Sequence, residues 1–242
     1  MVFSNLQNNL PVSVLQSLRD RFNDSNQILI GGSYIKGCSN TQSDIDVVII
    51  YQAVQAIERE NYYCDGTLID LAIHDIRSLR NTILRERLNA MCSVADYMVH
   101  AVPLLNLDEG TVYLKQFAAD AINAGPPPFD IESSKAHLLG QVDDIRLCTD
   151  QTERMTLAAG ILTQLVVFVL RSGGGWLGAA KYMGRDLRRV NARFSDALLE
   201  VAQDAFTPHG AVALADFTLE TIASVTGDVE KQWTKSYPIP PS

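Results

Sequence analysis

The sequence predicts an α/β, or α+β, domain with a small mixed sheet, followed by an all-α helical bundle domain. Three observations support this fold class. Short β-branched runs and a hairpin signal lie before residue 125, a Gly-Pro-Pro-Pro run at 125–128 interrupts every periodic pattern, and only helical periodicity follows it. We therefore expect an α/β domain over residues 1–125 and a helical bundle over residues 130–235.

Helices and strands are mixed in the first half. The expected elements are a helix at 10–22, strands at 27–30, 44–51, 61–64 and 67–74, a long helix at 76–99, a strand at 101–105 and a helix at 109–124. Asp65-Gly66 is the strongest hairpin signal in the chain. Asp75 is expected to cap the long helix.

Only helices are expected in the second half. They cover residues 131–148, 153–171, 176–189, 196–206 and 211–233, and a Gly-Gly-Gly run at 173–175 separates two of them. The longest apolar run, Ile161 to Leu170, is shorter than a membrane span and is interrupted by polar residues. It therefore predicts a buried helix, and no membrane association is expected.

Composition narrows the classes of function. The chain has 242 residues, 47% hydrophobic and 20% charged, which is typical of a globular protein. Its net charge of −8 disfavours a nucleic-acid partner, which would need a basic surface, and leaves room for a cationic small substrate. Four scattered cysteines without a C-x-x-C pair indicate reduced thiols and no zinc site. With no signal-peptide pattern at the N-terminus, we expect a cytoplasmic protein.

A glycine pair and a serine directly follow the strand expected at 27–30. Glycine lets the backbone approach a ligand closely and reach positive φ, and Ser33 can cap a short helix whose free N–H groups would face an anion. Gly31, Gly32 and Ser33 are therefore candidate phosphate-binding residues. Many tight turns contain the same residue types, so this motif alone does not decide between the two interpretations.

Two aspartates, Asp44 and Asp46, lie two residues apart on the next expected strand. Because strand side chains alternate, both carboxylates point to one face, while Ile45, Val47 and Ile49 point to the other. Carboxylates on one face repel each other unless a cation lies between them, and Mg²⁺ is a hard cation that prefers oxygen ligands. In the alternative, Asp44 caps a turn and Asp46 is solvated.

Asp70 interrupts an otherwise apolar strand pattern at 67–74. A charged residue there is costly to bury unless it is paired or bound to a metal. A hairpin would carry this strand next to the one that holds Asp44 and Asp46. Three converging carboxylates can bind two metal ions, one lowering the pKa of an attacking hydroxyl and the other stabilising a leaving pyrophosphate.

The order and spacing of these residues resemble the DNA polymerase β-type nucleotidyltransferase superfamily. Gly32-Ser33, then Asp44-Ile45-Asp46 after an eleven-residue step, then Asp70 match its pattern Gly-Ser, h-Asp-h-Asp-h and h-Asp-h, where h is hydrophobic. The match covers about residues 28–74. In size and helical second half, the chain is also similar to small bacterial aminoglycoside nucleotidyltransferases. The resemblance implies an NTP donor, Mg²⁺ as cofactor and transfer of a nucleoside monophosphate to an acceptor hydroxyl.

A basic cluster at 176–189 supplies candidates from the second half. In the family, a lysine of the helical domain often reaches the triphosphate, which implies Lys181 and, as second choice, Arg185 as nucleotide-binding residues. A solvated helix face is the alternative. Asp143 and Asp144, on the first bundle helix, could act as base toward the acceptor, as an acidic residue outside the metal triad does in similar enzymes, or could lie on the surface.

Together these residues predict a catalytic site for transfer of AMP from ATP to a hydroxyl of a small molecule, an aminoglycoside-like compound among the candidates. Asp44 and Asp46 would bind two Mg²⁺ ions, and Asp70 the catalytic one. Three alternatives stay open. They are transfer to a protein, as in antitoxin-type adenylyltransferases, transfer to RNA ends, which the acidic charge disfavours, and a non-catalytic descendant that only binds nucleotide. The oligomeric state, a dimer included, is also open.

Overall fold

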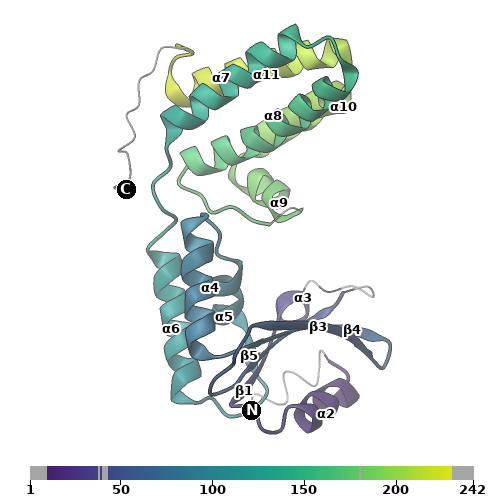
Figure 1. Ribbon diagram of the computed structural model, residues 1–242, viewed down its shortest axis with the longest axis vertical. Coiled ribbons are helices and arrows are strands. Elements are labelled where there is room, and N and C mark those ends of the chain that lie inside the picture. Colours follow the sequence, from purple (N-terminus) through teal and green to yellow (C-terminus); the bar gives the residue numbers. More distant parts are fainter. Residues whose placement is uncertain (1–9, 38, 40–42, 180, 231–242) are drawn as a thin grey trace. The chain divides into compact units, whose positions relative to one another are not determined.

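The computed structural model describes residues 10–37, 39, 43–179 and 181–230. The chain divides into two compact units, Met1–Pro127 and Pro128–Ser242. The first holds a mixed sheet with helices, and the described part of the second holds helices (Figure 1). The fold class expected from the sequence, an α/β domain with a small mixed sheet followed by a helical domain, is therefore confirmed.

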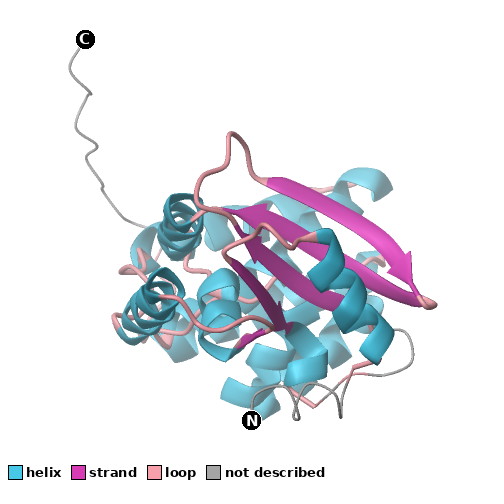
Figure 2. Ribbon diagram, turned by 90° about the horizontal axis from the view of Figure 1, so that it is seen from below, coloured by secondary structure: helices cyan, strands magenta, loops and turns pink. Residues whose placement is uncertain are grey.

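A five-stranded sheet organises the first unit. Its strand order is β3-β4-β2-β1-β5; β2 and β4 run parallel, and every other neighbouring pair is antiparallel. Figure 2 shows the strands of this sheet in magenta, with helices around them in cyan. The elements of this unit are α2 (Val12–Arg21), β1 (Gln27–Gly31), α3 (Gly32–Ile35), β2 (Ile45–Ile50), β3 (Glu58–Cys64), β4 (Thr67–His74), α4 (Ile76–Leu88), α5 (Ser93–His100), β5 (Val102–Pro103) and α6 (Glu109–Asn123).

The hairpin expected at Asp65-Gly66 joins β3 to β4. Both turn residues have positive φ, 48° at Asp65 and 74° at Gly66, which a two-residue type I′ turn requires. This short turn pairs Cys64 with Thr67 and thereby sets the register of the whole hairpin.

The two faces of the sheet carry separate hydrophobic cores. Ile45, Val47 and Ile49 pack with the buried residues of α2 on one face. On the other face, Leu29 and Ile50 pack with buried residues of α4, α5 and α6. Helices thus cover both faces of the sheet, and strand alternation decides which side chains meet which helices.

The single helix expected over residues 76–99 is wrong, because α4 and α5 are separate helices. Ala90 adopts a left-handed φ of 56°, and its N–H donates to the carbonyl of Arg87, which closes α4. The Glu86 carboxylate then accepts a hydrogen bond from the N–H of Val94 at the start of α5. Apolar residues on both sides of the break still face one core, so the hydrophobic pattern conceals the interruption.

Five helices make up the described part of the second unit: α7 (Ile131–Leu147), α8 (Gln151–Ser172), α9 (Lys181–Val190), α10 (Ala192–Asp204) and α11 (Pro208–Thr226). Side chains at the caps of four of them accept backbone hydrogen bonds, namely those of Asp130, Asp150, Asn191 and Thr207.

Several expected helix boundaries in this unit differ from the structure. The helix expected from residue 196 begins at Ala192, after Asn191 as its N-cap, and the helix expected from residue 211 begins at Pro208. The helix expected from residue 176 begins at Lys181, and Gly178 within the expected span is a poor helix former. Gly227, with a φ of 84°, ends α11 in a left-handed cap. The expected end of that helix at Trp233 lies outside the described residues.

Helix α8 is longer than the apolar run that marks it in the sequence. It has 22 residues, and an 18-residue window within it has a mean hydropathy of 1.7, so by length and composition it could cross a membrane. A core helix passes the same test. The buried side chains of α8, Leu165 and Phe168 among them, pack into the hydrophobic core of the second unit.

Candidate metal centre

Three carboxylates converge at one end of the sheet in the first unit. Asp44 lies immediately before β2, Asp46 lies in β2 and Asp70 lies in β4. Asp46 and Asp70 are direct partners in the parallel register of the two strands. One ligand oxygen of each residue lies within 4.8 Å of those of the other two, and all three side chains are half-buried. The structure therefore brings together the three acidic residues that the sequence singles out.

Strand alternation explains which face of the sheet holds the acids. Ile45 and Val47, the neighbours of Asp46 in the chain, are buried against the α2 side. Asp46 therefore shares the opposite face with Val48 and Ile50, which pack with the α4–α6 core. A rigid strand thus carries the carboxylate, with apolar residues anchoring it on both faces.

Gly32 leaves room for the carboxylate of Asp46. Its φ is 71°, a conformation that favours glycine. A Cβ atom added at this position would lie 1.7 Å from Oδ2 of Asp46. Glycine is needed here so that the carboxylate can lie directly against the backbone turn between β1 and α3.

Gly31 has a different contact. A Cβ atom added there would lie 2.2 Å from a ring carbon of Tyr97, a residue of α5. The ring of Tyr97 thus occupies the space that a side chain at position 31 would need. These contacts explain both glycines by packing, while their phosphate contact stays a prediction.

Ser33 does not cap the short helix, so this expectation is wrong. Helix α3 already begins at Gly32, its N-cap is Gly31, and no side chain caps it. The positive φ of Gly32 turns the chain into the helix two residues earlier than a Ser33 cap would. Ser33 therefore lies within the first turn, and its binding of phosphate stays a prediction.

Two side chains of β3, Arg59 and Asn61, contact Asp70. Nη2 of Arg59 lies 3.3 Å and 3.1 Å from the two carboxylate oxygens. The Asn61 amide, oriented with its nitrogen toward Asp70, donates to Oδ1 at 3.0 Å. Neither residue was predicted from the sequence. The hairpin turn offered the signal, since its register places Asn61 opposite Asp70 and alternation puts Arg59 on the same face.

The donor set fits a hard divalent cation. Three carboxylates supply oxygen ligands of the kind that Mg²⁺ prefers. The charge of Arg59, whose side chain is 72% exposed, offsets only part of the negative charge of the triad. The remaining charge favours a cation among the three acids.

Tyr97 lies near the acidic triad. Burial raises the pKa of its hydroxyl well above the ordinary value, and the negative charge of Asp46 raises it further. Tyr97 therefore remains a neutral hydrogen-bond donor at physiological pH.

The remaining candidate residues belong to the second unit. Lys181 is the first residue of α9, and its side chain lies outside the described part of the structure. Arg185 is exposed, with its guanidinium 5.3 Å from the centre of the Tyr182 ring. On α7, Asp143 is half-buried and Asp144 is exposed. Because these residues and the triad lie in different units, their roles stay predictions.

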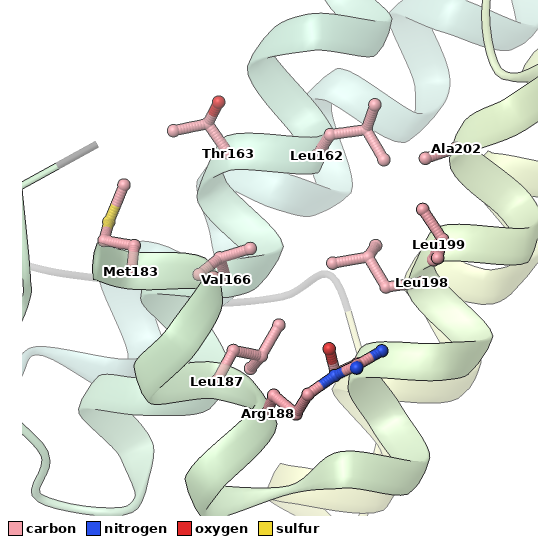
Figure 3. A pocket seen from close by; sticks show the side chains of 11 residues that line it. Leu162, Thr163, Val166, Met183, Leu187, Arg188, Leu198, Leu199 and Ala202 are labelled. Carbon is pink, nitrogen blue, oxygen red and sulfur yellow. The ribbon is translucent and has the colours of Figure 1, made fainter. Parts of the chain in front are cut away.

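The second unit also contains an apolar hollow of about 490 Å³ between α8, α9 and α10 (Figure 3). Its lining residues are Leu162, Thr163, Val166, Met183, Gly184, Leu187, Arg188, Ser195, Leu198, Leu199 and Ala202. Arg188 is paired with Asp196 at 2.8 Å. With mostly aliphatic walls, the hollow is chemically unlike the acidic triad.

Sequence comparisons find no match, either to a protein-family model or to a curated protein. Among solved structures, the chain is similar to a nucleotidyltransferase-like protein from Exiguobacterium sibiricum 255-15, with 13% sequence identity and a TM-score of 0.48. The similarity covers 88% of this chain and 78% of that one.

Proposed function

We propose that this protein is an Mg²⁺-dependent nucleotidyltransferase that transfers AMP from ATP to a hydroxyl of a small molecule. The observation that carries the proposal is the convergence of Asp44, Asp46 and Asp70, with one oxygen of each within 4.8 Å of the others. A domain that only binds nucleotide has no need of three acids held so close together, because their mutual repulsion is unfavourable without a cation.

The triad would hold Mg²⁺, two ions in the complete site. Bound Mg²⁺ would lower the pKa of the acceptor hydroxyl and neutralise charge on the triphosphate. Asp70 would orient the acceptor, and its contacts with Arg59 and Asn61 restrict its carboxylate to one position. Rigid placement of the reacting groups is a large part of what such a site contributes to the rate.

In the proposed reaction, the acceptor oxygen forms a bond to the α-phosphorus of ATP. The bond from that phosphorus to the bridging oxygen breaks, and pyrophosphate leaves with the electron pair. The hydroxyl proton passes to a base, for which Asp143 and Asp144 remain our candidates. Gly31, Gly32 and Ser33 would contact the phosphates from the first unit, and Lys181 or Arg185 from the second.

For the acceptor, we propose a hydroxylated and preferably cationic molecule, such as an aminoglycoside-like compound. The net charge of −8 supports this choice, because binding of a phosphate backbone depends on contacts from lysine and arginine. We also propose a cytoplasmic location, in keeping with four scattered cysteines that form no C-x-x-C pair.

Parallel assays with ATP labelled at the α- or the γ-phosphate test the proposal. The full-length protein and Mg²⁺ are incubated with aminoglycosides, other small alcohols, proteins and RNA. We expect the α-label, and not the γ-label, to appear on a small molecule, and we expect a chelator to abolish the transfer.

Asp46→Asn serves as the inactive control in these assays. Transfer by this variant at the wild-type rate would contradict the assignment of the triad. Label found only on protein or only on RNA would exclude the small-molecule acceptor and favour the corresponding alternative. Transfer of the γ-label would identify a phosphotransferase instead.

A further inference from the structure

One tyrosine of α5 contacts both strands that form the site. The hydroxyl of Tyr97 donates to the backbone carbonyl of Leu29 in β1 at 2.9 Å and to that of Asp46 in β2 at 3.2 Å. A hydroxyl carries one proton, so the two carbonyls share it. The ring of the same side chain lies against the Cα atom of Gly31, the register partner of Asp46.

The helix that carries Tyr97 is itself firmly anchored. Ala95 and Met98 of α5 are 2% and 0% exposed in the α4–α6 core. At the C-terminal end of α5, the Lys115 ammonium donates to the carbonyls of Met98 and Ala101, at 2.7 Å in each case. The tyrosine hydroxyl therefore reaches the strands from a rigid support, as a group that orients a metal ligand must.

The contact with Asp46 bears directly on the carboxylate. Tyr97 holds the backbone carbonyl of Asp46, and the turn at Gly32 limits where the carboxylate can lie. The hydroxyl of Tyr97 thus restrains the backbone of Asp46, and Gly32 restrains its side chain. A small shift of this residue would change the separation of its carboxylate from those of Asp44 and Asp70, which are within 4.8 Å.

We propose that Tyr97 is a positioning residue of the metal centre, which holds Asp46 at the distance from Asp44 and Asp70 that a divalent cation requires. This role rests on the proposed function, because it presumes that the triad binds metal. The hydroxyl acts through the backbone of Asp46 and does not contact the reacting atoms.

Binding of Mn²⁺ to the full-length protein tests this role, since Mn²⁺ accepts the same oxygen ligands as Mg²⁺ and gives an electron paramagnetic resonance signal. In Tyr97→Phe the ring and its contact with Gly31 remain, and only the hydroxyl is lost. We expect Mn²⁺ to bind about fivefold more weakly, the equivalent of one hydrogen bond. We also expect the signal of bound Mn²⁺ to broaden, because the carboxylate then occupies a wider range of positions.

Tyr51→Phe is the matched control. Tyr51 follows the opposite end of β2, and its hydroxyl donates to Asp24 at 3.3 Å. The control thus removes a tyrosine hydroxyl and one hydrogen bond from the same strand, away from the acids. Its Mn²⁺ affinity should equal that of the wild type.

Gly31→Ala tests the same contact from the strand side. The added methyl group would lie 2.2 Å from the Tyr97 ring, so the ring must move and the hydroxyl must leave the two carbonyls. We expect this variant also to bind Mn²⁺ more weakly. Wild-type affinity in either folded variant would overturn the positioning role. Absence of Mn²⁺ binding by the wild type would instead contradict the proposed function.

Discussion

The acidic triad of the first unit and the apolar hollow of the second are built in different ways. Strand register assembles the triad, since pairing of β2 with β4 places Asp46 beside Asp70. The hollow is bounded by aliphatic side chains from three helices, where α8, α9 and α10 do not fill the space between them. Acidic side chains on paired strands thus converge on a site that fits a cation, whereas the helical hollow offers apolar surface.

Among the variants, Asp46→Asn should cause the largest loss of Mn²⁺ affinity. This change removes one of three charged ligands from the centre of the triad and keeps the shape of the side chain. We expect Mn²⁺ affinity to fall at least about 100-fold, beyond the range typical of outer-shell substitutions. The melting temperature should stay the same or rise, because the change also relieves repulsion between carboxylates.

Asp65→Asn is the control for this charge removal. Asp65 lies in the turn between β3 and β4 with a φ of 48°, which asparagine tolerates. The control therefore removes a carboxylate from the same sheet outside the triad, and Mn²⁺ affinity should be unchanged. Equal losses in both variants would mean that Mn²⁺ responds to the charge of the domain and not to a defined site.

Gly32→Ala should cause the next largest loss of Mn²⁺ affinity. The added Cβ atom would collide with Oδ2 of Asp46, which can rotate away at the expense of the metal site. We expect Mn²⁺ to bind at least about tenfold more weakly. The positive φ of 71° should reduce the free energy of unfolding by about 1–2 kcal/mol.

Gly37→Ala separates these two consequences. Gly37 has a similar φ of 67°, and among the described residues, its own chain neighbours aside, no atom lies within 4 Å of an added Cβ. It should therefore lose a similar amount of stability, measured by urea denaturation, with no change in Mn²⁺ affinity. If the two alanine variants bind Mn²⁺ equally well, Gly32 is required for its backbone conformation alone.

The triad was accessible to prediction because its geometry is repetitive. Strand alternation predicts that Asp44, just before β2, and Asp46, within it, share one face, and the Asp65-Gly66 turn predicts the hairpin that carries Asp70. The alternation and the turn each need only a local pattern and the period of a strand. The parallel pairing of β4 with β2, which brings Asp70 beside Asp46, is a contact between segments that are distant in the chain.

Other features depend on contacts between distant residues. No local pattern shows that Tyr97 lies against Gly31, since the two come from different elements. The break between α4 and α5 escaped prediction because the apolar positions on either side share one core. The hollow likewise depends on how three helices pack, which helical periodicity does not determine.

Ala202→Leu tests whether the hollow of the second unit can accept a side chain, and it should have a smaller effect, on the free energy of unfolding. Ala202 lines the hollow, so a larger apolar side chain can enter existing space. We expect the free energy of unfolding to rise by up to about 1 kcal/mol, as cavity-filling changes commonly give. Mn²⁺ affinity should not change, because the substitution adds no charge and lies outside the unit that holds the triad.

Ala215→Leu is the matched control in the same unit. Ala215 is 0% exposed in the helical core, so the same added volume should overpack it and cost about 1–3 kcal/mol. Urea denaturation measures both variants. If they lose stability equally, the space at Ala202 is not available to a side chain, and the contrast between a hollow and a close-packed core disappears.

Arg59→Gln should have the smallest effect of these variants. The direction of its change in Mn²⁺ affinity tells whether the charge of Arg59 or its contact with Asp70 matters more. The guanidinium of Arg59 lies 3.1 Å from an oxygen of Asp70 and is 72% exposed, so its loss should change the free energy of unfolding by less than about 1 kcal/mol. Its positive charge opposes a bound cation, and removal should tighten Mn²⁺ binding about twofold at low salt. This gain should shrink as ionic strength rises, because salt screens exposed charges.

Arg21→Gln is the control for this last measurement. Arg21 of α2 pairs at 2.6 Å with Glu60 of β3, the strand that also holds Arg59. Its guanidinium lies over the ring of Tyr62, which packs with the α2 core. An arginine is therefore lost beside β3 without a contact to the triad, and Mn²⁺ affinity should be unchanged. Weaker Mn²⁺ binding in Arg59→Gln alone would reverse our interpretation. Arg59 would then act mainly by orienting Asp70 for the metal, and orientation would outweigh charge at this corner of the sheet.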